Sequence, residues 1–364
     1  MGIAGKYATL KRLGKYLLIR GVAVLVTTVI AIYMVIIIAN MGGFVDEIIK
    51  SEIQFYVYEA IRNNPAYRGL NKSTIELIAQ EWIELEIKRI GLDKPFVYRS
   101  FNYLRDALTL NLGRAIRITS ASGSKQVRII ILERLPASIL LFTSIQIMLF
   151  FSSLTAGLYL SRRYGSKIDR IIVALSPLSS MPGWFYGLFL IMVFASWLGI
   201  LPYGGIVDAP PPEHPLPYAL SVLKHMILPT MSWFIAYFAI STYSMRTFFL
   251  MFSSEDYVEL AKAKGVPPKE IERRYILRPT LPPIITQLAL ILISSWMGAI
   301  ITENIFNWPG IGTLIWMAIA NNDSPVLIGI VTIYAYLLAI TVLLLDVIYV
   351  LIDPRIKIGG VSTQ

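Results

Sequence analysis

Runs of apolar residues long enough to cross a lipid bilayer constrain this chain more than any other feature. About 20 helical residues, rising about 1.5 Å each, span the hydrocarbon core. Only 15% of the 364 residues are charged, against about 25% in a soluble domain. This pattern excludes an ordinary soluble enzyme and predicts an all-α membrane protein with six transmembrane helices. The predicted spans are residues 21–39, 135–160, 183–201, 226–245, 281–302 and 325–345.

The third run is interrupted by residues that break helices. The uncharged stretch 171–207 is too long for one straight crossing, and Pro177, Pro182 and Gly183 lie near its start. Proline removes a backbone donor and clashes with the preceding helical turn. We therefore expect a kink there, with the main crossing at 183–201.

The distribution of Lys and Arg predicts the orientation of the chain, because short cytoplasmic loops carry an excess of these residues. Not counting Arg20 at the start of the first span, the N-terminal segment and the loops 161–170 and 246–278 carry four, four and seven of them, whereas loops 203–225 and 303–324 carry only Lys224. We expect a multi-pass protein of the cell (inner or plasma) membrane with both termini cytoplasmic. We interpret the net charge of +10 as a consequence of this orientation in the lipid bilayer. We therefore expect no nucleic-acid partner.

These spans divide the chain into four segments. They are a cytoplasmic N-terminus with the first transmembrane helix (1–40), a small helical external subdomain between helices 1 and 2 (41–134), a five-helix transmembrane core (135–352) and a cytoplasmic tail (353–364). In the external segment Ile75, Ile78, Trp82 and Leu85 recur at helical spacing. An amphipathic helix is therefore expected between Asn71 and Asp93.

The loop 246–278 predicts a helix, a sharp elbow and a second helix. Ser254 is placed to cap a helix running through Lys264, with acids in its first turn and lysines in its last. Gly265 follows where a left-handed C-terminal cap is expected, and two prolines after it prevent continuation. The second helix is expected over 269–277.

The first of these helices is expected to have one exposed face that is suited to a partner. Tyr257, Leu260 and Ala261 share it at spacings of three and four residues, and small residues permit close approach by another protein. The alternative is an amphipathic helix that rests on lipid headgroups through its lysines. The residues alone leave both interpretations open.

The same residues match a known pattern. Glu259-Leu260-Ala261 followed by Gly265 resembles the EAA-x3-G coupling loop of ABC importer permeases, and the variant resembles the permeases of dipeptide and oligopeptide importers. Leu260 departs from the general loop, which has Ala there. The resemblance extends through Glu133-Arg134-Leu135-Pro136-Ala137, Trp308-Pro309-Gly310 and Asp353-Pro354-Arg355.

The resemblance implies a type I ABC importer permease fold and a non-catalytic subunit that forms half of a path for di- or oligopeptides. It implies four kinds of neighbour, namely a second homologous permease, two cytoplasmic ATPase subunits, an external solute-binding protein and the lipid bilayer. ATP and Mg would bind to the ATPases, with no cofactor, metal or catalytic residue in this chain. No G-x4-GK[ST] phosphate loop is present in the sequence. The implied ATPase-coupling residues are Tyr257, Glu259, Leu260, Ala261, Lys264, Gly265 and Arg278.

Two further groups of residues are candidates. The family places the region around Glu303 at the external mouth of the path, so an external gate and binding-protein contact is expected there. The alternative is an interfacial loop anchored by Trp308 and Trp316. Asp346 lies in an apolar run, where a carboxylate is either functional or a structural charge paired with Arg or Lys, which we favour. The expected gate residues are Glu303, Asn307, Trp308, Pro309 and Gly310.

Other functions remain open at this point. The same machinery serves oligosaccharides or nickel complexes in related permeases. A secondary transporter or channel that is independent of ATPases is the alternative from another class, and it usually shows inverted repeats and charged residues near the bilayer midplane.

Overall fold

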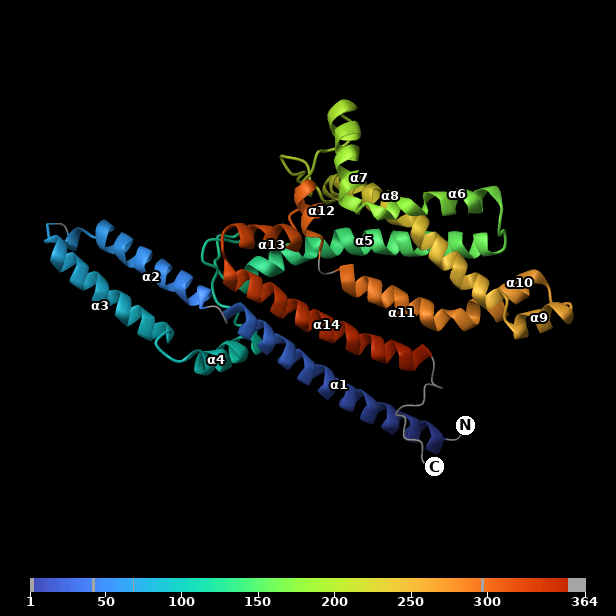
Figure 1. Cartoon of the computed structure of the whole chain (residues 1–364), viewed down its shortest axis with the longest axis horizontal. Helices are drawn as coiled ribbons and strands as arrows, with labels where there is room; N and C mark the ends of the chain where they lie inside the picture. The colour runs from blue at the N-terminus through green and yellow to red at the C-terminus, as the bar shows by residue number, and fades with distance from the viewer. Residues whose placement is uncertain (1–2, 41–42, 68, 296–297, 353–364) are drawn as a thin grey trace. The chain divides into compact units, whose positions relative to one another are not determined.

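The computed structural model describes residues 3–40, 43–67, 69–295 and 298–352. Throughout this described part the regular elements are helices (Figure 1), apart from one isolated antiparallel bridge between Arg114 and Gln126. The predicted all-α class is confirmed. The predicted tail 353–364 lies outside the described residues, as do positions 296–297 of the fifth predicted span.

Five helical segments of the described chain are long and apolar enough to cross a membrane. On α1 (Ile3–Asn40) the exposed apolar residues include Leu18, Leu25 and Ile38, as expected for a helix that faces lipid. The segments are Leu17–Ile38 of α1, Val127–Ser161 (α5), Pro215–Ser253 (α8), Pro268–Leu292, which enters α11 (Arg278–Ser295), and Ser324–Val347 of α14 (Ser324–Ile352).

The third predicted crossing differs from expectation. A helical segment, α6 (Lys167–Leu175) extended by the 3-10 turn Ser176–Ser180, meets α7 (Gly183–Leu190) and a following π-helix (Ile191–Trp197) at 94°. The eight residues of α7 and seven of the π-helix fall short of the about 20 that a crossing needs. The predicted break is confirmed, with Pro182 at the N-cap of α7. The main crossing over 183–201 stays a prediction, and the described part of the chain has up to six spans if the bent pair counts as one.

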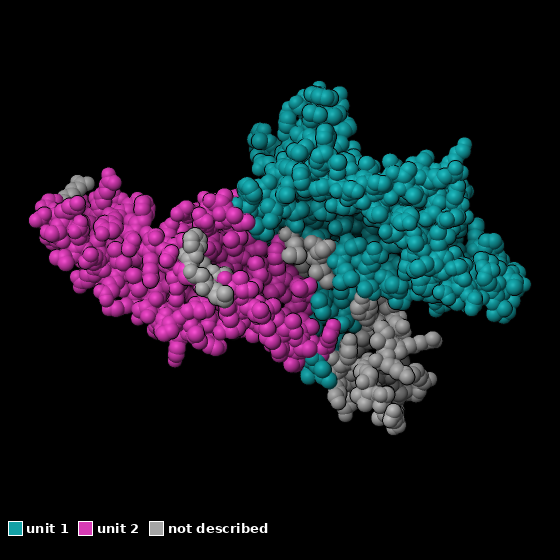
Figure 2. All heavy atoms as spheres, viewed as in Figure 1, with its two compact units in different colours: residues 1–19, 134–316, 340–364 teal, residues 20–133, 317–339 magenta. Residues whose placement is uncertain are grey.

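The chain forms two compact units (Figure 2). Unit 1, drawn in teal, comprises residues 1–19, 134–316 and 340–364. Unit 2, drawn in magenta, comprises residues 20–133 and 317–339. Both candidate sites of the sequence analysis, the loop 246–278 and the region around Glu303, belong to unit 1.

In unit 2, α2 (Phe44–Asn63) and α3 (Lys72–Ile90) pack side by side, followed by α4 (Phe96–Leu108) (Figure 1). Their apolar core includes Val57, Ala79 and Ile83. The predicted helix between 71 and 93 is confirmed as α3. Its face is slightly rotated from the expected one, because Leu85 points outward whereas Ile83 is buried.

Unit 1 is built around α5 and α8. Leu141 and Ile145 of α5 pack with Met226 of α8 and with Trp308 into one buried cluster. Further along the same helices a second cluster contains Phe150, Phe249 and Ile284. Besides α6 and α7, the shorter helices of this unit are α9 (Asp256–Ala263), α10 (Pro268–Glu270) with a π-helix (Ile271–Leu277), α12 (Ile300–Ile305) and α13 (Ile311–Ala320), the last continuing into unit 2.

Candidate functional site

The loop between α8 and α11 forms the predicted elbow (Figure 1). Its first helix, α9, begins at Asp256 with Glu255 at the N-cap, and Asp256 and Glu259 place negative charge at the positive end of the helix dipole. The predicted cap by Ser254 is wrong. Its hydroxyl instead donates to the Met251 carbonyl oxygen at 2.9 Å, because Ser254 is the C-cap residue of α8.

Gly265 makes the turn that ends α9. Its φ is +74°, in the left-handed region that favours glycine. The Gly265 N–H donates to the Lys262 carbonyl oxygen at 2.9 Å and the Val266 N–H to that of Ala261 at 3.2 Å. These two bonds form a Schellman cap, so the predicted left-handed cap is confirmed, and α10 then begins at Pro268.

A small apolar core joins the two arms of the elbow. Val258 and Ala261 of α9 pack against Ile271 of the following π-helix, with Val266 and Tyr275 around them. Ala261 is only 3% exposed. The expectation that Ala261 lies on the exposed face is therefore wrong, since its small side chain lets the elbow's own arms approach each other. The elbow is packed as one body.

The outer face of α9 carries Tyr257 and Leu260, the latter 57% exposed. Burial raises the pKa of the Tyr257 hydroxyl and Glu255 adds to the effect, so this group remains a neutral donor at physiological pH. Glu259 accepts a hydrogen bond from Lys262 at 2.6 Å, with both side chains exposed. Two exposed apolar side chains, those of Tyr257 and Leu260, thus lie on α9 together with charged ones.

Two remaining coupling candidates sit at the ends of the elbow. Lys264 is the C-cap residue of α9 and Arg278 the first residue of α11, and both are exposed. Arg162, next to the end of α5, forms a 2.8 Å ion pair with Glu272 in the second arm. The elbow is thus tied to the helix end beside it.

A buried ion pair lies near the base of the elbow. Arg246 of α8 donates from Nη2 to Oδ2 of Asp169 on α6 at 2.8 Å, and the Gly165 N–H donates to the same oxygen at 2.9 Å. The Arg246 guanidinium lies 4.7 Å from the centre of the Tyr164 ring. Sequence reasoning missed this pair, because Asp169 and Arg246 are 77 positions apart and each looks like an ordinary loop charge.

Glu303 of α12 is completely buried. Its carboxylate accepts from the Ser138 hydroxyl at 2.6 Å and from the Thr313 N–H at 3.0 Å. The Ser138 oxygen in turn accepts from the Ile311 N–H at 2.7 Å. A Cβ at Gly310 would collide with the Glu303 carboxylate and the Ser138 hydroxyl, so glycine is required for this close approach.

Trp308 is also completely buried, and its indole N–H donates to the Ala137 carbonyl oxygen at 2.9 Å. Trp308 therefore does not anchor the chain in the membrane interface, whereas Trp316 is exposed. Of the expected gate residues, Asn307 is exposed and Pro309 is partly so. The structure thus brings Glu303, Trp308 and Gly310 together as a buried support beneath an exposed turn.

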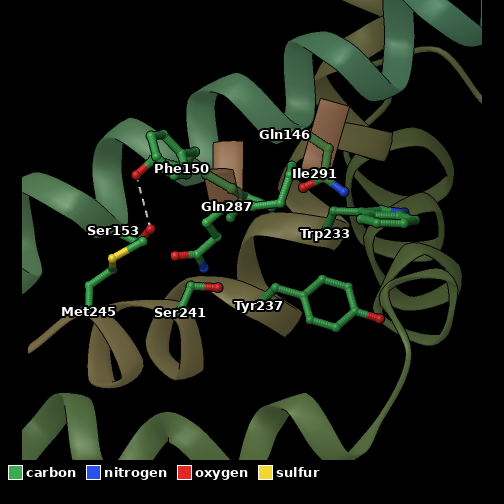
Figure 3. A pocket seen from close by; sticks show the side chains of 10 residues that line it. Gln146, Phe150, Ser153, Trp233, Tyr237, Ser241, Met245, Gln287 and Ile291 are labelled. Atoms are coloured by element: carbon green, nitrogen blue, oxygen red, sulfur yellow. Dashed lines mark hydrogen bonds between the residues drawn. The ribbon is translucent and has the colours of Figure 1, made fainter. Parts of the chain in front are cut away.

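Asp346 of α14 is buried and engages another group, and its pairing with a basic side chain stays a prediction. Among the residues that the structure describes, no three His, Asp or Glu side chains gather as a metal site would require. A cavity of about 270 Å³ also lies between helices of unit 1, lined by glutamine, serine and aromatic side chains (Figure 3). Sequence reasoning missed this cavity, since its residues come from three separate helices.

The chain is similar to known proteins over a region that contains both the elbow and Glu303. Residues 153–358, more than half of the chain, match the family described as binding-protein-dependent transport system inner membrane component. The chain is 31% identical to the oligopeptide transport system permease protein AppB of Bacillus subtilis (strain 168), over 84% of this chain and 93% of that protein. It is 30% identical to the probable D,D-dipeptide transport system permease protein DdpB of Escherichia coli (strain K12), over 75% and 84%. It is 31% identical to the di/tripeptide transport system permease protein DppB of Pseudomonas aeruginosa (strain UCBPP-PA14), over 74% and 84%.

Proposed function

The chain belongs to the family of binding-protein-dependent transport system inner membrane components, and from this premise we propose that it forms half of a membrane path for di- or oligopeptides. It is a non-catalytic membrane subunit of an ABC transporter. The names of the similar proteins, which refer to oligopeptides, D,D-dipeptides and di/tripeptides, support peptide as the solute.

The other half of the path comes from a second, homologous permease. Two ATPase subunits bind ATP and Mg and supply the energy, and an external binding protein delivers the peptide. The Lys and Arg counts of the short loops support an orientation in which both termini and the elbow lie in the cytoplasm.

The outward-facing Tyr257 and Leu260 on a rigidly packed elbow are the observation that carries this proposal. The ATPase covers this face. Because the core around Ala261 joins both arms of the elbow, closure of the ATPases on ATP moves the elbow as one body. That movement shifts the path between inward- and outward-facing states, a population shift driven by differential binding.

At the opposite mouth, the exposed turn at Asn307 and Pro309 contacts the external binding protein. Glu303, Trp308 and Gly310 act from beneath, since they are buried and hold this turn in position. The gate is therefore an exposed turn held in position by buried residues. The buried residues do not contact the binding protein, and they influence its binding only by fixing the shape of the turn.

The test is co-purification of the ATPases with the detergent-extracted chain. A Leu260→Asp variant places a charge on the docking face without disturbing the core of the elbow, so we expect it to insert normally and to lose the ATPases. Leu216→Asp is the matched control. Leu216 is an exposed leucine in the first turn of α8, at the end of that helix away from the elbow. We expect the Leu216→Asp variant to retain the ATPases.

Peptide uptake by the purified chain alone in liposomes, with no ATPase recovered in any preparation, would support a secondary transporter instead. Retention of the ATPases by Leu260→Asp would remove α9 from the contact surface.

A further inference from the structure

A cavity lined by both apolar and polar side chains lies between α5, α8 and α11 of unit 1 (Figure 3). Its volume of about 270 Å³ is just below the range of about 300–1,000 Å³ typical of small-molecule sites. α5 contributes Gln146, α8 contributes Tyr237 and Ser241, and α11 contributes Gln287. In Figure 3 the Gln287 amide and the Ser241 hydroxyl both reach into the space between the helices.

These polar groups have no hydrogen-bond partner in the described part of the chain. Nearby polar groups on the same helices do, since the Ser153 hydroxyl donates to the Phe150 carbonyl oxygen at 3.0 Å and Thr143 is bonded to Ser295 at 3.1 Å. A polar group within the membrane is costly unless it is satisfied. Gln146, Gln287 and Ser241 are therefore placed to bind water or a solute in the cavity.

The chemistry of the lining indicates the kind of solute. Among the described residues, no Asp, Glu, Lys, Arg or His lines the cavity. A glutamine side chain offers an N–H donor and a carbonyl acceptor together, which is the complement of a peptide group. Both Gln146 and Gln287 offer this pair, whereas a charged solute would find no counter-ion.

We propose that this cavity binds main-chain amide groups of the peptide during its passage, with Gln146 and Gln287 as the principal contacts and Ser241 as a third. The inference rests on the proposed function and extends it to the residues that contact the solute. Because every peptide carries the same amide groups, this recognition is independent of side-chain sequence. The second permease supplies the remaining wall of the site.

The position of the cavity also couples it to the elbow. α8 ends at Ser253 and α11 begins at Arg278, so the elbow joins the two helices that carry Ser241 and Gln287. A movement of the elbow changes the spacing between these two side chains. Peptide is held while that spacing fits the amide groups and is released when it changes.

The first test uses the absence of cysteine from this chain. Single variants Gln287→Cys and Ser241→Cys are introduced into the complete importer in liposomes and labelled with a small water-soluble thiol reagent. We expect both to be labelled and tri-alanine, supplied with its binding protein and ATP, to slow labelling at least threefold. Thr286→Cys, next to Gln287 but outside the cavity lining, is the matched control and should show no protection. Equal protection at all three positions, or none at any, overturns the proposal.

The second test measures transport. Gln146→Leu with Gln287→Leu should lower tri-alanine uptake at least tenfold, while the amount of complex assembled with the ATPases stays within twofold of that of the unmodified importer. Ser144→Ala with Thr286→Val, in which each lost hydroxyl bonds only its own helix, is the control and should transport normally. If the unmodified complex takes up tri-alanine and the double leucine variant does so equally well, the cavity is not the peptide site, while the proposed function still stands. If the unmodified complex takes up no peptide, the proposed function fails, and this inference with it.

Discussion

The Ser138 hydroxyl donates a 2.6 Å hydrogen bond to the Glu303 carboxylate, although 165 positions separate the two residues. Ser138 lies on α5 next to Ala137 of the buried cluster, and Glu303 lies on α12, where its carbonyl oxygen accepts from the N–H of Trp308 in the same cluster at 2.7 Å. The same hydroxyl oxygen accepts from the Ile311 N–H. One serine therefore connects α5 to the residues on both sides of the turn that we propose meets the binding protein.

Ser138→Ala tests this connection. The substitution removes one hydrogen bond from the buried Glu303 carboxylate and leaves the buried Ile311 N–H without its partner, so we expect the stability to fall by about 1–3 kcal/mol. The measurement is the midpoint of thermal unfolding of the detergent-solubilised protein. Ser144→Ala is the matched control, since that hydroxyl bonds only Leu140 of its own helix, and its effect should stay within about 0.5 kcal/mol. Equal midpoints for the two variants would contradict the connection.

Gly265→Val tests the geometry of the elbow. No atom lies within 4 Å of a Cβ built at Gly265, so the cost is one of backbone conformation, about 1–2 kcal/mol for a residue held in the left-handed region. We expect a protein that inserts in the membrane but loses peptide uptake. Gly265→Asn is the control, because asparagine tolerates this conformation, and it should keep most of the uptake. Normal uptake by the valine variant would count against the elbow as the coupling element.

Features governed by neighbours along the chain could be predicted from the sequence. Five apolar runs correspond to long apolar helices, and the glycine and prolines after Lys264 predicted the cap of α9. The break before α7 followed from Pro182 in the same way. These signals are local, since a helix begins, ends or bends according to the residues within one turn.

Features governed by packing could not be predicted. Ala261 was assigned to an exposed face because the pattern of α9 does not reveal that Ile271 folds back onto it. The pairing of Asp169 with Arg246, and that of Ser138 with Glu303, join residues far apart in the sequence. Contacts between positions so far apart produce no local pattern in the sequence of a single chain.

The pair of Asp169 and Arg246 supports a prediction on stability. Removing one member of a buried ion pair leaves an uncompensated charge, at a cost of about 3–5 kcal/mol. We expect Asp169→Ala to lower the unfolding midpoint strongly, or to reduce the amount of inserted protein. The double variant Asp169→Leu with Arg246→Met removes both charges, so it should be more stable than Asp169→Ala. A double variant as unstable as the single one would show that the ion pair is not the cause.

In unit 2, Arg99 of α4 donates from Nη1 to Oδ1 of Asp46 on α2 at 2.7 Å, and this contact makes the stability depend on pH. This hydrogen bond lowers the pKa of the Asp46 carboxyl, and partial burial opposes the effect. In the unfolded chain the pKa of Asp is about 3.9. Because the pKa of Asp46 is lower in the folded state than in the unfolded state, the folded state binds fewer protons at pH values near these pKa values. The pair therefore stabilises the fold to its full extent above the pKa of the unfolded state. Its contribution is lost as the pH falls through the folded-state pKa, below about pH 4.

Asp46→Asn tests this by removing the charge at every pH. We expect the variant to unfold at a lower temperature than the unmodified protein at pH 7 and pH 5, and the gap between the two midpoints to narrow as the pH is lowered from 4 to 3. Glu84→Gln is the matched control, because Glu84 pairs with Lys88 on the exposed surface of α3, where an ion pair contributes little. The difference in unfolding midpoint between Glu84→Gln and the unmodified protein should be small at every pH. A gap for Asp46→Asn that stays constant down to pH 3 would mean that packing of the side chain, and not its charge, stabilises the contact between α2 and α4.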